Sequence, residues 1–200
     1  MLEEPVGRTR EFDYDDVVEK AMLLFWRRGY VATSIGAIES ETGLTKGSLY
    51  KAFDNKRDLF VKCLERYMVR DSYKAVFIRM FDRPLSETFE YMFDMLIDSS
   101  KGSERPCGCL ATNVVDELVP IDKDLAEQVS SGLAGMQEAM EFRFRWAQDQ
   151  GEISSDANIE TLASVAMVML QGMVVLSTST KDVASMRRAR DFLLELLKRS

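Results

Sequence analysis

The chain has 200 residues, of which 33 are acidic and 26 basic, and it contains no histidine. This length is enough for one large or two small domains, and 46% apolar with 30% charged residues is the composition of an ordinary soluble globular protein. Because histidine is absent, the commonest general base, the Ser-His and Cys-His nucleophile pairs and the usual zinc ligands are missing, which argues against most hydrolytic and metal-dependent enzymes.

Export and membrane signals are not evident in the sequence. The first ten residues, MLEEPVGRTR, place acids before any apolar run and do not resemble a secretory signal. The most apolar segment starts at Thr161, is interrupted by Gln171 and Gly172, and falls short of the roughly 20 apolar residues of a membrane-spanning helix. We therefore expect a cytoplasmic protein with no membrane partner, whose three cysteines are free thiols.

The first predicted helix runs from Asp13 to a stop at Gly29. Its apolar residues have the one-sided spacing of an amphipathic helix, and acidic residues occupy the first turn, where the helix dipole favours them. A glycine followed by an apolar residue that folds back on the last turn, here Tyr30 toward Phe25, predicts a Schellman-type end. The apolar positions are Val17, Val18, Ala21, Leu24 and Phe25.

Two short helices follow, separated by a tight turn. Thr33 or Ser34 is expected to cap the first of them, which Gly43 ends. Thr45 then opens a further helix with the sequence KGSLYKAF. A short helix, a glycine-containing turn and a second short helix are the spacing of a helix-turn-helix unit.

The third helix has one apolar and one polar face. Leu49, Ala52 and Phe53 share a side with Thr45, whereas the opposite side carries a glycine, a phenol and a cation. The second helix of such a unit normally enters the DNA major groove with its N-terminal residues nearest the bases. The candidate DNA contacts on this helix are therefore Lys46, Gly47, Tyr50 and Lys51.

Local charge supports the same interpretation. Residues 43–57 hold four cations and one acid, a local charge of +3 in a chain whose net charge is −7. Lys56 stands in the first turn of the next helix, where unpaired backbone N–H groups and a lysine together form a natural phosphate clamp.

The segment TSIGAIESETGLTKGSLYKAFDNKRDLF closely resembles the N-terminal DNA-binding domain of the TetR/AcrR family of transcriptional regulators, over about residues 8 to 65. Its most specific part is the run Gly43, Lys46, Gly47, Leu49, Tyr50, Phe53, Lys56 and Leu59. In that family the reading helix corresponds to Thr45 through Phe53, and the residues matching Tyr50, Lys56 and the cap at Thr33 or Ser34 commonly contact the DNA backbone.

The resemblance implies an all-α fold in two parts. Residues 8–55 would form a three-helix helix-turn-helix domain, and residues 56–200 a helical domain for effector binding and dimerisation. The implied partners are a double-stranded, palindromic operator, a second copy of the chain in an Ω-shaped homodimer, and a small-molecule effector of unknown identity. No cofactor is expected.

Beyond residue 65 the helical pattern continues. A long helix is expected from Lys56 into the 70s, another from about Pro84, a loop over residues 101–106, a helix near residues 110–118, and a long apolar stripe that ends at Gln150 and Gly151. A stripe of Met and Phe is first of all core, but such adaptable side chains also suit an apolar effector pocket. The candidate pocket residues are Phe89, Phe93, Met136, Met140 and Phe144.

Two further helices, about residues 156–177 and 182–198, carry more apolar surface than a single core needs. A surface of this width often forms an interface, and the last two helices usually form the dimer bundle in the family that this chain resembles. The candidate interface residues are Val165, Met169, Met173, Leu193 and Leu197.

The two cysteines of the segment RPCGCLATNV allow a second hypothesis. Cys107 and Cys109 flank a glycine at a predicted helix start, where the helix dipole favours a reactive thiolate. Some family members that sense electrophiles or oxidants carry a cysteine in a comparable GCL context, which corresponds here to Cys109. The alternative is that both are small packed residues at a tight turn. Without histidine, a metal site is not expected.

The sequence thus predicts a DNA-binding transcriptional regulator, a repressor released from its operator by a small effector or by thiol modification. Two alternatives remain open at this point. A helical enzyme similar to a glutathione transferase would use a thiol or tyrosine and show turnover. A helical adaptor that binds other proteins would tolerate loss of Lys46, Tyr50 and Lys51.

Overall fold

The computed structural model describes residues 12–102 and 106–199, and within these ranges the chain is built from helices with no strand. The all-α prediction is therefore confirmed. The predicted domain start at residue 8 and part of the predicted loop at 101–106 lie outside the described residues. The helices are α1 Tyr14–Arg28, α2 Ile35–Thr42, α3 Lys46–Ala52, α4 Lys56–Arg70, α5 Tyr73–Arg79, α6 Leu85–Ser100, α7 Leu110–Leu118, α8 Lys123–Asp149, α9 Ile159–Thr178 and α10 Val183–Arg199.

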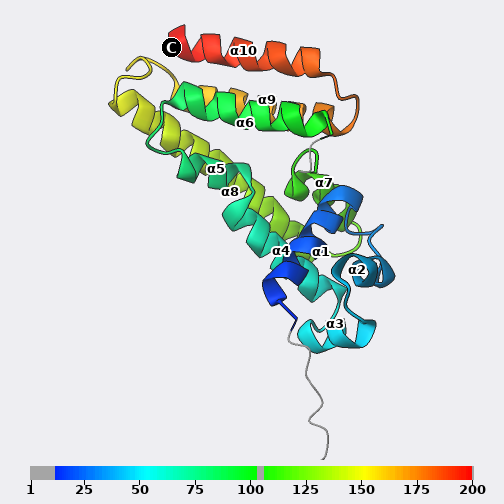
Figure 1. The fold of residues 1–200 in the computed structure, drawn as a ribbon. Coiled ribbons are helices and arrows are strands. Elements are labelled where there is room, and N and C mark those ends of the chain that lie inside the picture. Colours follow the sequence, from blue (N-terminus) through cyan, green and yellow to red (C-terminus); the bar gives the residue numbers. More distant parts are fainter. Residues whose placement is uncertain (1–11, 103–105, 200) are drawn as a thin grey trace, which may run out of the picture.

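The helices form two regions (Figure 1). Helices α1 to α3 lie at one end, and α4, which packs on α1, leads away from them toward α5. Helices α6, α9 and α10 lie at the other end, with α7 between the two regions. The small N-terminal region therefore presents α2 and α3 on the side opposite α10.

Helix α1 is fixed at its start and along one side. The Asp13 side chain accepts hydrogen bonds from the N–H groups of Asp15 at 2.9 Å and Asp16 at 3.2 Å, which caps the helix as the acidic first turn predicts. Its apolar face packs on α4. At the edge of that contact, the Glu19 carboxylate accepts hydrogen bonds from Arg66 at 2.8 Å and Arg70 at 2.6 Å.

The end of α1 is tied to α7. The N–H of Gly29 donates to the carbonyl of Phe25 at 2.8 Å, and the rings of Phe25 and Tyr30 stack at 6.0 Å, as expected. The predicted Schellman geometry is wrong, however, because Gly29 has φ 82° and ψ 171°, outside the left-handed helical region. A Cβ at Gly29 would lie 2.1 Å from Oε1 of Glu117, whose other oxygen accepts from the N–H of Val31 at 2.8 Å.

The expected long helix after Lys56 is two helices. Helix α4 ends at Arg70, and α5 begins at Tyr73 after Ser72, whose hydroxyl accepts a hydrogen bond from the N–H of Ala75 at 3.1 Å. Ser72 is thus an N-cap in the middle of the segment that apolar spacing alone assigns to one helix. The break lets the chain turn so that α5 packs against α8.

Four of the five residues predicted to line a pocket lie in the core of the C-terminal region. Phe89, Phe93, Met140 and Phe144 are fully buried. The ring of Phe89 lies 5.9 Å from that of Phe93 and 5.6 Å from that of Phe144. None of these four lines the cleft described below, and their packing corresponds to the core interpretation of the Met and Phe stripe. Met136 differs, because it lines a small, partly open cavity.

A buried ion pair joins the ends of α6 and α8. Arg143 is 1% exposed, and its Nη2 donates to the carbonyl of Arg83 and lies 3.5 Å from Oε1 of Glu152. The other oxygen of Glu152 accepts from the N–H of Leu85 at 2.6 Å, at a helix start where Pro84 offers no side-chain cap. Among the described residues, Nε and Nη1 of Arg143 have no hydrogen-bond partner.

Three of the five residues of α9 and α10 that the sequence assigns to an interface face into the chain. Met173, Leu193 and Leu197 are buried within the chain, so their assignment to an exposed interface is wrong for the single chain. Both helices pack on α6, and these three side chains lie on the buried faces. The large apolar residues that do face outward on these helices are Val165 at 36% exposure, Val168 at 72%, Val175 at 55% and Phe192 at 61%. Met169 is half-buried.

Helix α9 also has the length and composition of a membrane span, with a mean hydropathy of 1.8 over its most apolar window. Only 33% of that window is buried in the chain, and no other helix among the described residues meets the same test. The segment that Gln171 and Gly172 interrupt in the sequence is thus one continuous helix, only part of which is buried within the chain. One face of α9 packs on its neighbours, and the other is an apolar face without cover in the single chain.

Candidate DNA-binding surface

Helices α2 and α3 form a helix-turn-helix with a cap at each start. The Ser34 hydroxyl accepts from the N–H of Ala37 at 3.2 Å, and Thr45 accepts from the N–H of Ser48 at 3.3 Å. Between them Gly43 adopts the left-handed conformation that ends α2, with φ 74° and ψ 7°. The carboxylate of Glu39 in α2 accepts a hydrogen bond from the N–H of Lys46, which holds the first residue of α3 against α2.

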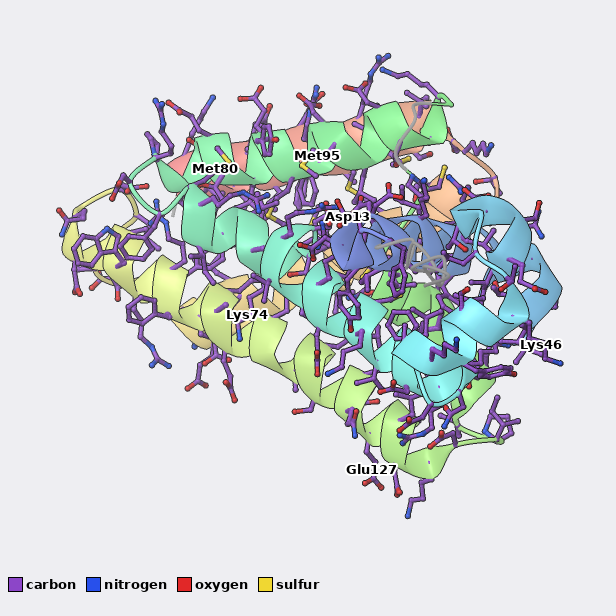
Figure 2. All side chains as sticks on the ribbon, turned by 60° about the horizontal axis from the view of Figure 1, so that its bottom comes forward. Asp13, Lys46, Lys74, Met80, Met95 and Glu127 are labelled. Carbon is purple, nitrogen blue, oxygen red and sulfur yellow. The ribbon has the colours of Figure 1, made fainter. Side chains whose placement is uncertain are left out.

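The apolar side of α3 fixes its rotation. Leu49 and Phe53 are 3% exposed, and the ring of Phe53 lies 5.2 Å from that of Tyr14 on α1. The opposite side is open to solvent, as the sequence predicts from the helical period. Figure 2 shows Lys46 at the outer edge of this region. The exposed residues on and beside this face are Ser34, Thr45, Lys46, Gly47, Tyr50 and Lys51.

A cation and a phenol are neighbours on this face. Nζ of Lys46 lies 5.9 Å from the centroid of the Tyr50 ring, and the Tyr50 side chain is 44% exposed. The Cβ position of Gly47 meets only one atom, at 4.0 Å, so the backbone of the first turn is open to close approach. The face therefore offers hydrogen-bond donors, positive charge and accessible backbone together, which is what a phosphate-lined groove requires.

Thr33 is the predicted contact that the structure corrects. Its side chain is 0% exposed, and its hydroxyl donates a hydrogen bond to the carbonyl of Gly29 at 2.6 Å. Thr33 therefore closes the turn between α1 and α2, while its neighbour Ser34 is the exposed N-cap. Spacing alone does not separate these two residues, because Thr33 would cap a helix that begins at Ser34 and Ser34 would cap one that begins at Ile35.

Two of the four cations of the basic segment are engaged by side chains outside α3. Nζ of Lys56 lies 4.3 Å from the centroid of the Tyr30 ring, where burial lowers its pKa and the nearby Glu117 carboxylate opposes the change. Arg57 forms an ion pair with Asp122 at 2.6 Å, and its hydrogen bond to that carboxylate raises the pKa of the guanidinium. The local charge available on α3 itself therefore comes from Lys46 and Lys51.

Besides the packing of α1 on α4, the N-terminal region contacts α7 and the residues that flank it. Nε1 of Trp26 donates to the carbonyl of Cys107 at 3.1 Å, and the Trp26 ring packs edge-on against Tyr67 at 5.0 Å. Together with the Val31 to Glu117 hydrogen bond and the Arg57 to Asp122 pair, these contacts connect α1 and α4 to both ends of α7.

The two neighbouring cysteines occupy different environments. Cys107 is half-buried and lines an open cleft of about 650 Å³ beside Trp26, and its thiol lies 3.0 Å from the carbonyl of Ser99. Cys109 is 4% exposed, is the N-cap residue of α7, and accepts a hydrogen bond from the hydroxyl of Tyr67 at 3.1 Å. Burial raises the pKa of the third thiol, Cys63. Across the described ranges, no group of acidic or cysteine side chains is arranged to hold a metal ion.

Comparison with known proteins identifies the family. Residues 17–63 match the bacterial regulatory proteins of the tetR family, and residues 87–193 match a tetracyclin repressor-like C-terminal domain. The HTH-type transcriptional repressor ComR of Escherichia coli K12 is 30% identical over 184 residues, which cover 91% of this chain and 86% of ComR. The uncharacterized HTH-type transcriptional regulator YezE of Bacillus subtilis is 27% identical over 188 residues, 93% of this chain and 95% of YezE.

Solved structures agree on the fold. A cysteine mutant of the TetR family transcriptional regulator CifR, complexed with 26-bp double-strand operator DNA, superposes with a TM-score of 0.77 at 24% identity and covers 94% of this chain and 98% of its own. Membership sets aside both the helical enzyme and the adaptor that binds no DNA. The chain belongs to the TetR family of bacterial regulatory proteins, whose members are DNA-binding transcriptional regulators and not enzymes.

Proposed function

We propose that this protein is a cytoplasmic repressor that binds a palindromic operator as a homodimer. The observation that carries the proposal is the exposed face of α3, where Lys46, Tyr50 and Lys51 lie together on a helix whose other face is buried. Gly47 would let the backbone approach the DNA, and Thr45 and Ser34 would contact phosphates at the two caps. Lys56 would support this surface through Tyr30, and Thr33 has no direct part in it.

The second element of the proposal is a dimer formed by α9 and α10. Val168, Val175 and Phe192 are large apolar side chains left exposed on these helices, and Val165 adds to the same helix face. Gly172 lies between the valines, and its Cβ position is in open space, so a partner helix could approach closely there. A second copy of the same surface would cover these residues, which accounts for the exposed apolar face of α9.

Its relatives support the repressor role. ComR is named as a repressor, and the CifR complex contains operator DNA. In a symmetric dimer the two α3 helices would meet successive turns of one side of the duplex, which matches a palindromic site. We further propose that residues 8–55 form the DNA-binding domain and residues 56–200 the domain that dimerises and binds an effector. A small molecule, or modification of Cys107 in its cleft, would then favour a spacing of the α3 helices that no longer fits the operator.

The decisive experiment is binding of the purified protein to the DNA upstream of its own gene at several salt concentrations. Lys51→Ala should weaken binding at every salt concentration. Because each protomer loses one phosphate contact, the slope of log affinity against log salt should fall by about two. Tyr50→Ala should weaken binding with little change in slope.

Lys198→Ala is the matched control, because it removes one exposed lysine from α10, at the end of the molecule opposite α3 (Figure 1). It should leave affinity and salt slope unchanged. If all three variants bind alike, or if the wild-type protein shows no preference for one palindromic sequence at any salt concentration, the proposed operator surface is wrong.

A further inference from the structure

Arg143 is a buried cation whose hydrogen bonds are incomplete. It lies near the end of α8 and is 1% exposed, and its Nη2 donates to the carbonyl of Arg83 and, at 3.5 Å, to Oε1 of Glu152. Its Nε and Nη1 are closed to solvent and have no hydrogen-bond partner among the described residues. An arginine side chain stays charged in a protein and carries five N–H groups. The surrounding chain therefore leaves part of this guanidinium unsatisfied.

The carboxylate of Glu152 compensates this charge only in part. Its 3.5 Å separation from Nη2 exceeds the about 2.7–2.9 Å of a charge-assisted hydrogen bond. Its other oxygen accepts from the N–H of Leu85 at 2.6 Å. Leu85 is the first residue of α6, where Pro84 gives no side-chain cap and the helix dipole places positive partial charge. The guanidinium and the start of α6 therefore share one carboxylate.

Aromatic side chains cover the guanidinium. The centroid of the Phe81 ring lies 5.7 Å from Cζ of Arg143, close to the limit of about 6 Å for a cation–π contact, so the ring offsets little of the charge. Phe81 stands on the turn between α5 and α6 and packs on Phe142 and Trp146, which are 62% and 40% exposed. Figure 2 shows Met80, the residue before Phe81, where α5 passes into α6. Because this cover consists of surface side chains, it can open to a small solute without disturbing the core.

The surroundings of Arg143 restrict the ligand. The unsatisfied atoms are N–H donors on a cation, which favour an anionic acceptor. Arg143 is the only cation among the buried residues that the structure describes, so a divalent anion would keep an unpaired charge there, which is costly. The charged residues beside the turn, Asp82, Arg83 and Glu87, are exposed, and water screens them. The site therefore suits a small monovalent anion of the size of chloride or formate.

We propose that Arg143 binds a small monovalent anion beneath the Phe81 ring, at the start of α6. The anion accepts hydrogen bonds from Nε and Nη1, and Glu152 remains with Nη2 and the N–H of Leu85. Because α9 and α10 both pack on α6, the anion stabilises the start of the helix that supports these two. The site is separate from the α3 face and from the cleft at Cys107, so it does not depend on the proposed function.

Thermal unfolding in chloride tests this site. An anion that binds only the folded chain raises Tm with the logarithm of its concentration, so between about 5 mM and about 300 mM chloride the Tm of wild type should rise by at least about 3 °C more than that of Arg143→Met. Gluconate, which is too large for the site, keeps the ionic strength constant. Arg145→Met is the matched control, because it removes an arginine of the same helix whose side chain is 59% exposed. It should respond to chloride as wild type does, and equal responses of all three proteins would overturn the inference.

A second measurement needs no substitution. Crystals of the wild-type protein grown in sodium bromide should show an anomalous peak within hydrogen-bonding distance of Nε or Nη1 of Arg143. Bromide at exposed side chains alone, which is an adventitious ion only, or a water molecule in its place at Arg143, contradicts the proposal. Neither assay contains DNA. Failure of the proposed function would appear separately, as absent operator binding, and would leave both results unchanged.

Discussion

Phe192 provides a quantitative test of the proposed dimer surface. Its side chain is 61% exposed in the single chain, and since a phenylalanine buries about 150–250 Å², roughly 120 Å² of apolar surface is open to a partner. At about 25 cal/mol per Å² its burial would contribute about 3 kcal/mol in each protomer, and about 2 kcal/mol of this should be lost in Phe192→Ala, which keeps the Cβ. The dimer carries the change twice, so about 4 kcal/mol is lost and dimerisation should weaken about 1,000-fold.

The assay is mass photometry of the protein at nanomolar concentration, supported by sedimentation equilibrium at higher concentration. Phe142→Ala is a closely matched control, because Phe142 is 62% exposed on α8, where it stacks with Phe81 at 5.9 Å. The control should dimerise as the wild type does, and Phe192→Ala should also lose operator affinity in proportion to its lost dimer. Equal dissociation constants for the two variants would refute the assignment of α10 to the interface.

Three further predictions concern stability. Gly29→Ala should lower the free energy of unfolding, measured with urea, by at least about 3 kcal/mol, and Gly43→Ala by about 1 kcal/mol. Both glycines have a positive φ that disfavours alanine, but only at Gly29 would the added Cβ also collide with a carboxylate, that of Glu117. Burial raises the pKa of Glu19, but hydrogen bonds from two arginines of α4 outweigh it, so the folded-state pKa is lowered. The stability that this contact provides is therefore present above the unfolded-state pKa of about 4.3 and is lost as the pH falls through the folded-state pKa. The difference in the free energy of unfolding between wild type and Glu19→Gln, measured with urea, should be constant at pH 6–8 and shrink below about pH 4. Glu152→Ala should lower Tm by about 4–8 °C, because it removes the carboxylate that accepts the hydrogen bond from the N–H of Leu85. Arg143→Met removes a buried cation with two nitrogen atoms that have no hydrogen-bond partner, and at low chloride concentration it should leave Tm unchanged or raise it; calorimetry measures both variants.

The N-terminal helices could be predicted from sequence because their limits are set locally. Asp13 and Thr45 cap helices with their own side chains, and Gly43 ends one through a conformation that glycine favours. Each signal lies within a few residues of the structure that it determines. The choice between Thr33 and Ser34 failed because it depends on a contact with the end of α1, which helical spacing does not report.

Three of the residues assigned to the interface are buried within the chain for a different reason. A helix that is apolar on most sides gives no indication of which side packs within the chain. The position of α6 decides that Met173 and Leu193 face inward, while Val168 and Phe192 remain outside. The one available signal was the spacing of Val165, Val168 and Val175, which places three valines on one side of α9.

The contacts at α7 restrict how the proposed effector can act on DNA binding. The shape of the α3 face is set within the N-terminal region, by Leu49 and Phe53 in its core and by Glu39 at its start, and none of these residues contacts the C-terminal region in the interactions described above. The region is attached to α7 through Trp26 and Val31. A ligand near α7 should therefore reorient the whole N-terminal region and leave the α3 face intact. Because such coupling is reciprocal, operator DNA should weaken effector binding by the same factor by which the effector weakens operator binding.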